Sequence, residues 1–444
     1  MNHLDRTVQP PLKEIEKIML PAIRQFNLTN GIPVYSIAAA NLEVIKVEFI
    51  FEAGRWQEPQ NALAATTSKM LLGGTSSKTA QQIAEEIEYF GATIGTEATV
   101  DYGLVTLYCL TKHVDKLLPL LKEVISDPIF PDKELETYIQ ISKQRLMVSL
   151  EKVDFLANKA FNEQLYGTQY PAGYTTTAED YDNITSTVLR SFHDAQYKNG
   201  KFKIIVAGNV TEHILSLLDA TFGKEDSTMS TNGQHLARVI MKPDNRKLFF
   251  PKKDTVQSGI RIGKMLANKL HPDYPSLRVL NTILGGYFGS RLMQNLREDK
   301  GYCYGIHSSI ASYLHDAHLY ISTEVGAEVT WNAVKEIYDE LDRLKTEIVS
   351  QEELQLVKNY LLGVYLGDVD GALNVAEVLR GLIVYGLDEQ FFYNLIESVK
   401  SVTPEEIQRL AIKYFDNSNM VEVVVGDPVL SNSDARIAEP AELV

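Results

Sequence analysis

Hydrophobic and polar residues alternate with a period of two in two distant stretches of the chain. Residues 90–110, FGATIGTEATVDYGLVTLYCL, and residues 304–324, YGIHSSIASYLHDAHLYISTE, each contain two strand-like runs with a polar turn between them. Such alternation is typical of strands with one buried face. From Val114 and from Val329 onward, the hydrophobic spacing becomes that of a helix. Both stretches therefore predict a β-hairpin followed by a helix.

The elements around these hairpins repeat in the same order. LLGG at 71–74 matches ILGG at 283–286, and a second helix is predicted at 130–147 and again at 349–366, with Asp132 and Ser350 as candidate N-caps. A capped helix and a hydrophobic strand at 183–210 (NITSTVLRSFHDAQY, then KFKIIVAGNV) parallel those at 401–429 (SVTPEEIQRLAIKYF, then MVEVVVGDPV). These parallels predict a tandem duplication.

The duplication divides the chain into two domains. We predict an N-terminal domain over residues 1–224, a polar linker over 225–246 and a C-terminal domain over 247–444. The first strand of each copy is expected in LTNGIPVYSIAA (28–39), where Asn30-Gly31 indicates a hairpin turn, and in VQSGIRIGKMLA (256–267). The expected fold class is α+β: two tandem homologous domains, each a mostly antiparallel sheet packed against helices, arranged like a clamshell.

Composition narrows the class of protein. The 444 residues are 45% hydrophobic and 23% charged, as in a soluble globular protein, and the net charge of −15 argues against nucleic acid or an anionic membrane as partner while slightly favouring basic ligands. The first twenty residues lack a signal-peptide core, and every apolar run is too short to span a bilayer, so a cytoplasmic location is expected. Cys109 and Cys303 are predicted to be buried free thiols.

Several motifs in fixed order carry a family resemblance. LTNGIPVY, FEAGRWQEP, MLLGGT, DPIFPDKELE and LGGYFGSRLMQNLREDKGYCYG occur in this order between about Leu28 and Asp427. Together with the duplication they resemble the pitrilysin and mitochondrial-processing-peptidase family of zinc peptidases. Active members of that family carry an inverted zinc motif, H-x-x-E-H, on the helix before the GGT turn.

The resemblance places the zinc motif at residues 65–69, where this chain differs. The residues there are Ala65, Thr66, Thr67, Ser68 and Lys69. Two histidines would bind the metal and the glutamate would activate water, so neither zinc nor catalysis is expected from this chain alone. The third ligand would fall near Leu150 or Glu151, and one carboxylate cannot hold zinc. The remaining close histidine pair, His315 and His318, is expected in a surface turn and not in a metal site.

The second half keeps a different part of the family pattern. The resemblance implies that an arginine and a tyrosine, here Arg297 and Tyr304, reach the zinc site and stabilise the negative charge that develops on the attacked carbonyl oxygen. Arg297 is expected in the last turn of a helix that Gly301 caps, and Tyr304 at the start of the next strand. Without the resemblance, Arg297 would be interpreted as a solvated cation at a helix end and Tyr304 as an ordinary strand residue.

Two glycines precede this pair. Gly285 and Gly286 correspond to a loop that contacts substrate in the family's non-catalytic subunits. The alternative is a turn between helices that requires a positive φ.

These features favour a non-catalytic subunit of a heterodimeric zinc metallopeptidase. A homologous chain carrying H-x-x-E-H would supply the zinc, and this chain would complete the active site in trans and help enclose peptide substrates, which the family binds as an added strand at a sheet edge. The alternative is a catalytically inactive homodimeric scaffold or peptide-binding protein of the same fold, in which Arg297 and Tyr304 are vestigial. No cofactor is expected in this chain itself.

Overall fold

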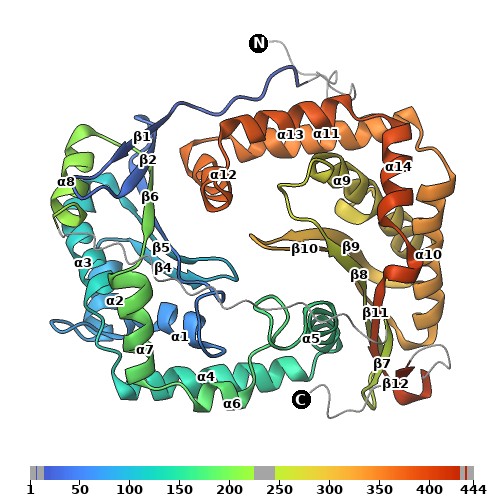
Figure 1. Ribbon diagram of the computed structural model, residues 1–444, viewed down its shortest axis with the longest axis horizontal. Helices are drawn as coiled ribbons and strands as arrows, with labels where there is room; N and C mark the ends of the chain where they lie inside the picture. Colours follow the sequence, from blue (N-terminus) through green and yellow to red (C-terminus); the bar gives the residue numbers. More distant parts are fainter. Residues whose placement is uncertain (1–6, 8–14, 225–245, 431–435, 438–444) are drawn as a thin grey trace.

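Two six-stranded sheets organise the protein (Figure 1). The computed structural model describes residues 7, 15–224, 246–430 and 436–437. The strands are β1 Ile23–Asn27, β2 Pro33–Ala38, β3 Val44–Phe51, β4 Thr93–Ala98, β5 Gly103–Leu110, β6 Phe202–Gly208, β7 Lys247–Pro251, β8 Gln257–Leu266, β9 Cys303–Ser312, β10 Ala317–Gly326, β11 Val421–Gly426 and β12 Arg436–Ile437. The predicted linker lies outside the described residues except for Arg246.

The two sheets have matching topologies except at one edge, where β1 pairs antiparallel with β2 and β12 pairs parallel with β7. Their strand orders are β1-β2-β6-β3-β5-β4 and β12-β7-β11-β8-β10-β9. In each sheet the parallel pair β2–β6 or β7–β11 is followed by antiparallel neighbours only. The predicted duplication and the mostly antiparallel α+β class are confirmed.

One predicted match between the copies is wrong. VQSGIRIGKMLA was aligned with the strand β2, but it forms β8, whose neighbours make it the counterpart of β3. The counterpart of β2 is β7, a short strand with the sequence KLFFP that pairs in parallel with β11. β7 is short and directly follows the polar segment 225–246, so the hydrophobic pattern there is too brief to reveal a strand.

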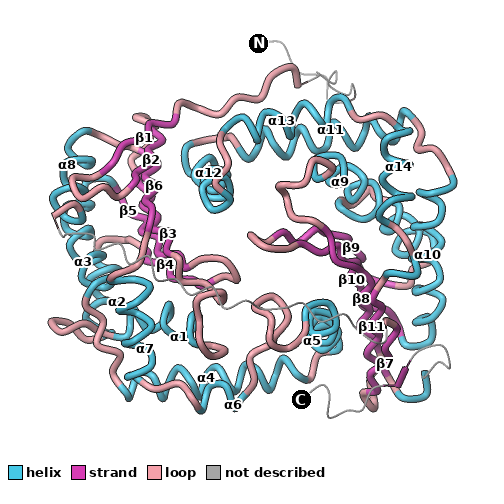
Figure 2. The backbone as a smooth tube through the Cα atoms, in the orientation of Figure 1, coloured by secondary structure: helices cyan, strands magenta, loops and turns pink. Residues whose placement is uncertain are grey.

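Helices cover both sheets (Figure 2). They are α1 Leu63–Met70, α2 Ala80–Tyr89, α3 Val114–Ser126, α4 Asp132–Leu150, α5 Val153–Tyr166, α6 Ala178–Asp182, α7 Ser186–His193, α8 Glu212–Phe222, α9 Tyr274–Asn281, α10 Thr330–Thr346, α11 Gln351–Asp368, α12 Ala372–Tyr385, α13 Glu389–Ser401 and α14 Pro404–Tyr414. Ser350 caps α11 by accepting a hydrogen bond from Glu353 N at 3.1 Å, as predicted. Asp132 is instead the first residue of α4, and Pro131 is its N-cap.

The two halves exchange one helix each. α5 lies in the N-terminal half, yet its Leu156, Ala160 and Phe161 share a buried cluster with Val423 and Val425 of β11. In return, α12 of the C-terminal half packs on the first sheet, as Figure 1 shows. Each sheet therefore has one face covered by helices of its own half and the other by a helix of the opposite half, which holds the halves together.

The strand β3 shows how the first sheet accepts its foreign helix. Ile45, Val47 and Phe49 alternate onto one face, where they join the hydrophobic core of the N-terminal half. Lys46 and Glu48 alternate onto the other face beneath α12, and both are buried. A charged pair on a buried face requires partners, because an unpaired charge away from water is strongly unfavourable.

The second helix of the exchange supplies these partners. Arg380 Nη1 of α12 lies 2.7 Å from Glu48 Oε1, and Lys46 Nζ lies 2.6 Å from the same oxygen. Glu377, one turn earlier on α12, pairs with both Lys46 and Arg380. The four side chains form an alternating network that fixes where α12 sits on the sheet.

Arg380→Ala should destabilise the protein by about 3 kcal/mol, because removing one partner of a buried pair leaves an insufficiently compensated charge, here on Glu48. Arg24→Ala, which breaks the exposed pair of Arg24 with Glu212, is the matched control and should cost less than about 1 kcal/mol. Urea denaturation followed by circular dichroism measures both. Equal effects of the two substitutions would contradict the structural role of the network.

The turn between β9 and β10 also connects the halves. His315 was predicted to lie in a surface turn with His318, but His318 is buried and shares a 2.8 Å hydrogen bond with Tyr166 Oη of α5. Asp316 accepts a hydrogen bond from Tyr170, and Leu314 N donates to Asp101 Oδ2 at 3.1 Å. His315 is exposed in the turn, as predicted, whereas His318 lies in β10 and is buried because this side of the hairpin meets the N-terminal half.

Burial raises the pKa of the Asp101 carboxyl to about 6. The native state thus keeps a proton on Asp101 up to a higher pH than the unfolded chain does, so stability falls as pH rises from about 4 to 6. Asp101→Asn keeps an oxygen that accepts from Leu314 N and should remove this part of the pH dependence. Urea midpoints between pH 4 and 8 test it, and parallel profiles of the two proteins would contradict it.

Two further expectations concern thiols and membranes. Cys109 and Cys303 are both free; Cys109 is buried, which raises its thiol pKa to about 12, and Cys303 is half-buried. Within the described ranges, no helix combines the length and the apolar character needed to cross a bilayer.

Candidate functional site

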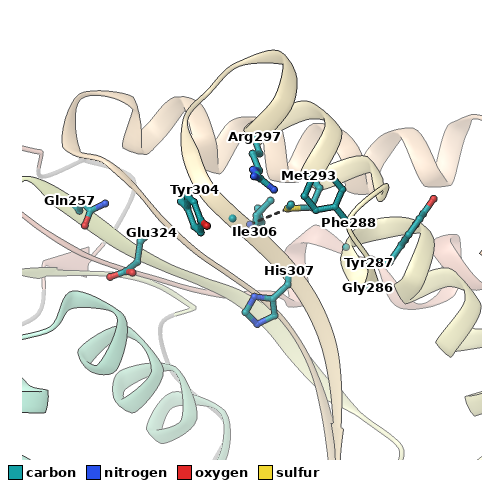
Figure 3. A pocket seen from close by; sticks show the side chains of 12 residues that line it. Gln257, Gly286, Tyr287, Phe288, Met293, Arg297, Tyr304, Ile306, His307 and Glu324 are labelled. Atoms are coloured by element: carbon teal, nitrogen blue, oxygen red, sulfur yellow. Dashed lines mark hydrogen bonds between the residues drawn. The ribbon is translucent and has the colours of Figure 1, made fainter. Parts of the chain in front are cut away.

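Arg297, Tyr304 and the two predicted glycines line one pocket in the C-terminal half (Figure 3). The pocket has a volume of about 510 Å³ and lies where the helical segment before β9 meets the beginning of β9. Its lining residues are Gln257, Gly285, Gly286, Tyr287, Phe288, Met293, Arg297, Tyr304, Gly305, Ile306, His307 and Glu324. Arg297 and Tyr304 were expected to converge on one point, and both line this pocket; the presence of Gly285 and Gly286 beside them was not predicted.

The local sequence explains how Arg297 is held. Residues Met293–Asp299 form a π-helical turn, in which Met293 and Leu296 are buried and leave Arg297 on the outer side. Gly301 follows with a φ of 65°, a left-handed conformation that favours glycine, so the predicted cap is correct. The chain then turns directly into β9, and Tyr304 stands beside Arg297.

Both side chains have donors free for a ligand. Arg297 Cζ lies 5.5 Å from the Tyr304 ring centroid and 4.7 Å from that of Phe288, which holds the guanidinium between two aromatic rings. Its nearest carboxylate is Glu298, at 3.6 Å from Nε. Tyr304 is 92% exposed, and its hydroxyl makes no hydrogen bond with any described residue. An exposed aromatic residue held by a cation, with its hydroxyl free, is suited to contact a bound molecule.

The two glycines serve close packing. Neither Gly285 nor Gly286 has a positive φ, so the predicted alternative of a left-handed turn is wrong. Instead, a Cβ at Gly285 would lie 2.6 Å from Ser308 N, because the π-helical turn Thr282–Gly286 packs directly against β9. The contact of Gly285 and Gly286 with substrate stays a prediction.

Sequence reasoning missed other residues of the pocket. Phe288 lies within the ILGGYFGSRL motif, so its place next to the glycines could have been noticed. His307, Gln257 and Glu324 come from three different strands, and only the sheet register brings them to one place. Burial and the nearby Arg261 lower the pKa of the His307 imidazole, which is therefore neutral at pH 7.

The residues at the expected zinc motif do not fit the metal. On α1, Ala65 and Lys69 are exposed and Ser68 is buried beside Tyr197. Lys69 Nζ donates to Thr96 O, so this position holds a fixed cation. Glu151, the nearest candidate for a third ligand, pairs with Lys252 at 2.8 Å.

The rest of the described chain offers no alternative cluster. In residues 15–224 and 246–430, no group of three or more histidine, cysteine, aspartate or glutamate side chains is placed to hold a metal ion. The duplicated two-sheet fold, a helix without ligands and an exposed Arg/Tyr pair define a peptidase-like protein that lacks a catalytic motif of its own.

Comparison with known proteins identifies the family. The profile described as "Insulinase (Peptidase family M16)" matches residues 34–172, and the profile described as "Peptidase M16 inactive domain" matches residues 183–361. The chain belongs to the M16, or pitrilysin, family, and its residues 65–69 lack that family's H-x-x-E-H motif.

Similar proteins agree with this assignment. A Bacillus subtilis protein named "Uncharacterized zinc protease YmxG" is 24% identical over 346 residues, which are 77% of this chain and 83% of that protein. A Helicobacter pylori protein named "Non-peptidase homolog YmxG" is 24% identical over 320 residues, 68% of this chain and 70% of that one. The crystal structure of a peptidase M16 inactive domain from Pseudomonas fluorescens shares the fold, with a TM-score of 0.81 at 23% identity over 92% of this chain and 99% of that one.

The purified chain should not retain zinc after dialysis, because structural and catalytic zinc sites need three or four protein ligands and residues 65–69 supply none. Metal analysis of the protein before and after equilibration with micromolar zinc tests this. One zinc per chain, lost on Ser68→Ala or Glu151→Ala, would contradict the assignment of these positions.

Proposed function

We propose that this chain is the non-catalytic subunit of a heterodimeric zinc peptidase and that it completes the active site of a homologous partner in trans. The partner carries the H-x-x-E-H motif and the zinc. The observation that carries the proposal is the contrast within one chain. Tyr304 and Arg297 are held side by side with free donors at an exposed site, whereas α1 presents an alanine and a paired lysine where ligands would stand.

The chemistry of the pair suits peptide hydrolysis. When a peptide carbonyl is attacked, negative charge develops on its oxygen, and donors that are already in position stabilise it. The Arg297 guanidinium supplies a permanent positive charge and N–H donors, and the Tyr304 hydroxyl supplies one more donor. The rings of Phe288 and Tyr304 hold the guanidinium at the pocket, so little ordering is needed when the substrate arrives.

The edge strand β9 offers a place for the peptide itself. β9 is the last strand of its sheet, so one side of its backbone has no partner strand among the described residues. Its residues Tyr304, Gly305 and His307 are exposed. An extended peptide that adds to this edge would bring its backbone past Arg297 and Tyr304.

Purification from the native source, with mass spectrometry of co-eluting proteins, should return a homologous chain that carries H-x-x-E-H. In the reconstituted pair, Arg297→Ala or Tyr304→Phe should each lower kcat by roughly 10²-fold, because each removes a donor to the developing oxyanion. Arg24→Ala and Tyr89→Phe, which change an exposed arginine and an exposed tyrosine elsewhere, are the matched controls.

Size-exclusion chromatography separates assembly from chemistry. Variants that still form the pair but lose kcat support a role in trans. Full activity of the double variant in an intact pair would contradict that role. A chain that forms only homodimers in the presence of its co-eluting proteins would contradict the heterodimer.

A further inference from the structure

A row of polar side chains crosses the second sheet on the face that α5 partly covers. In the strand register, Ser322 of β10 stands opposite Arg261 of β8 on one side and opposite His307 of β9 on the other. Directly opposite residues share a face, and neighbouring strands are about 4.8 Å apart, so Arg261 lies roughly 10 Å from His307. His307 also lines the pocket of Arg297 and Tyr304, so the row leads into that site.

The row opens into a second pocket of about 430 Å³. Its charged lining residues are Arg261, Lys152 and Asp154, and its neutral polar lining includes His307, Ser322 and Asn158. Two cations against one carboxylate give this pocket a positive balance, in contrast with the −15 of the whole chain. The local charge is opposite to the weak preference for basic ligands that the composition suggested.

Arg261 has more donors than partners. The residue is 4% exposed; its Nη1 donates to Ile260 O at 3.0 Å, and its Nη2 donates to the Asp154 carboxylate. Its Nε–H is buried and has no hydrogen-bond partner among the described residues. Asp154 is half-exposed, so the buried guanidinium is only partly compensated, and a second anion in the pocket would improve its electrostatic environment.

The beginning of α5 also contributes positive charge to this pocket. Lys152 is the N-cap of α5 but makes no capping hydrogen bond through its side chain, and its ammonium group has no partner in the described chain. The first backbone N–H groups of a helix lack intrahelical acceptors and carry a partial positive charge. The N-terminus of α5, Lys152 and Arg261 therefore all favour negative charge at one place.

We propose that this pocket, the Arg261–Lys152 pocket, binds a carboxylate of a peptide that lies along β9. This inference rests on the proposed function, which supplies the peptide, and it identifies the pocket that binds the peptide's carboxylate. His307 is three residues, or roughly 10 Å, along β9 from Tyr304, and Arg261 lies roughly 10 Å from His307 across the strands. The carboxylate therefore lies roughly 14 Å from the carbonyl held at Arg297. The carboxylate is either a C-terminus or an acidic side chain.

Fluorescence anisotropy with matched labelled peptides tests the proposal on the full chain. One peptide has a free C-terminal carboxylate, the second a C-terminal amide, the third an internal glutamate and an amidated end, and the fourth glutamine in place of that glutamate. At least one carboxylate peptide should bind about tenfold more tightly than its neutral counterpart, because only the carboxylate can form charge-assisted hydrogen bonds in the pocket; tenfold corresponds to about 1.4 kcal/mol. The pair that differs identifies the source of the carboxylate.

Substitutions locate the effect. Lys152→Ala removes an exposed side chain whose ammonium group makes no hydrogen bond or ion pair in the described chain, and it should reduce the tenfold preference. Arg261→Gln should abolish the preference. Lys133→Ala removes an equivalent exposed lysine near the start of α4 and should leave the preference unchanged. All variants should bind the neutral peptides equally.

The outcomes separate this proposal from the function on which it rests. Equal binding of charged and neutral peptides would overturn the carboxylate site while leaving peptide binding intact. A preference that stays tenfold in Lys152→Ala, in a protein with unchanged thermal melting, would also overturn it. Failure of every peptide to bind would contradict peptide binding on β9, and the carboxylate site with it.

Discussion

The exchange of α5 and α12 between the two halves is the constraint on which the structure depends. Each sheet has one face that only a helix of the opposite half covers, so neither half can bury all its apolar surface alone. A network of four charged side chains fixes the position of α12 on the first sheet, because buried charges tolerate only the arrangement that pairs them. The four are Lys46, Glu48, Glu377 and Arg380. The relative position of the halves is therefore fixed by the pairing of buried charges as well as by the burial of apolar surface.

This constraint also positions the candidate site. α5 lies against β8 and β11, and its N-terminus meets Arg261 at the margin of the open face. The uncovered part of the sheet ends in β9, where Arg297 and Tyr304 stand. A helix from the first half thus forms one wall of a surface that the second half supplies, and the two pockets on it are joined by His307.

Local signals in the sequence predicted local structure well. The alternation over 90–110 and 304–324 predicted both hairpins, and Ser350 and Gly301 marked the ends of their helices. The exchange was not predictable in the same way, because the apolar residues of α5 fit any apolar sheet face and the sequence does not say which one. The burial of Asp316 and His318 was not predicted for the same reason: their partners, Tyr170 and Tyr166, are distant in sequence. Arg297 and Tyr304 were found through the family resemblance, whereas Arg261 and His307 required the register of three strands.

In the proposed heterodimer, Tyr304 reaches the zinc helix of a homologous partner. The most direct test replaces Tyr304 with the photo-crosslinking residue p-benzoyl-phenylalanine, irradiates the native assembly and maps the linked peptides by mass spectrometry, with the same residue at the exposed Tyr89 as control. We expect crosslinks from position 304 to the partner's H-x-x-E-H helix and none to that helix from position 89. Crosslinks from position 304 only to another copy of this chain would contradict it.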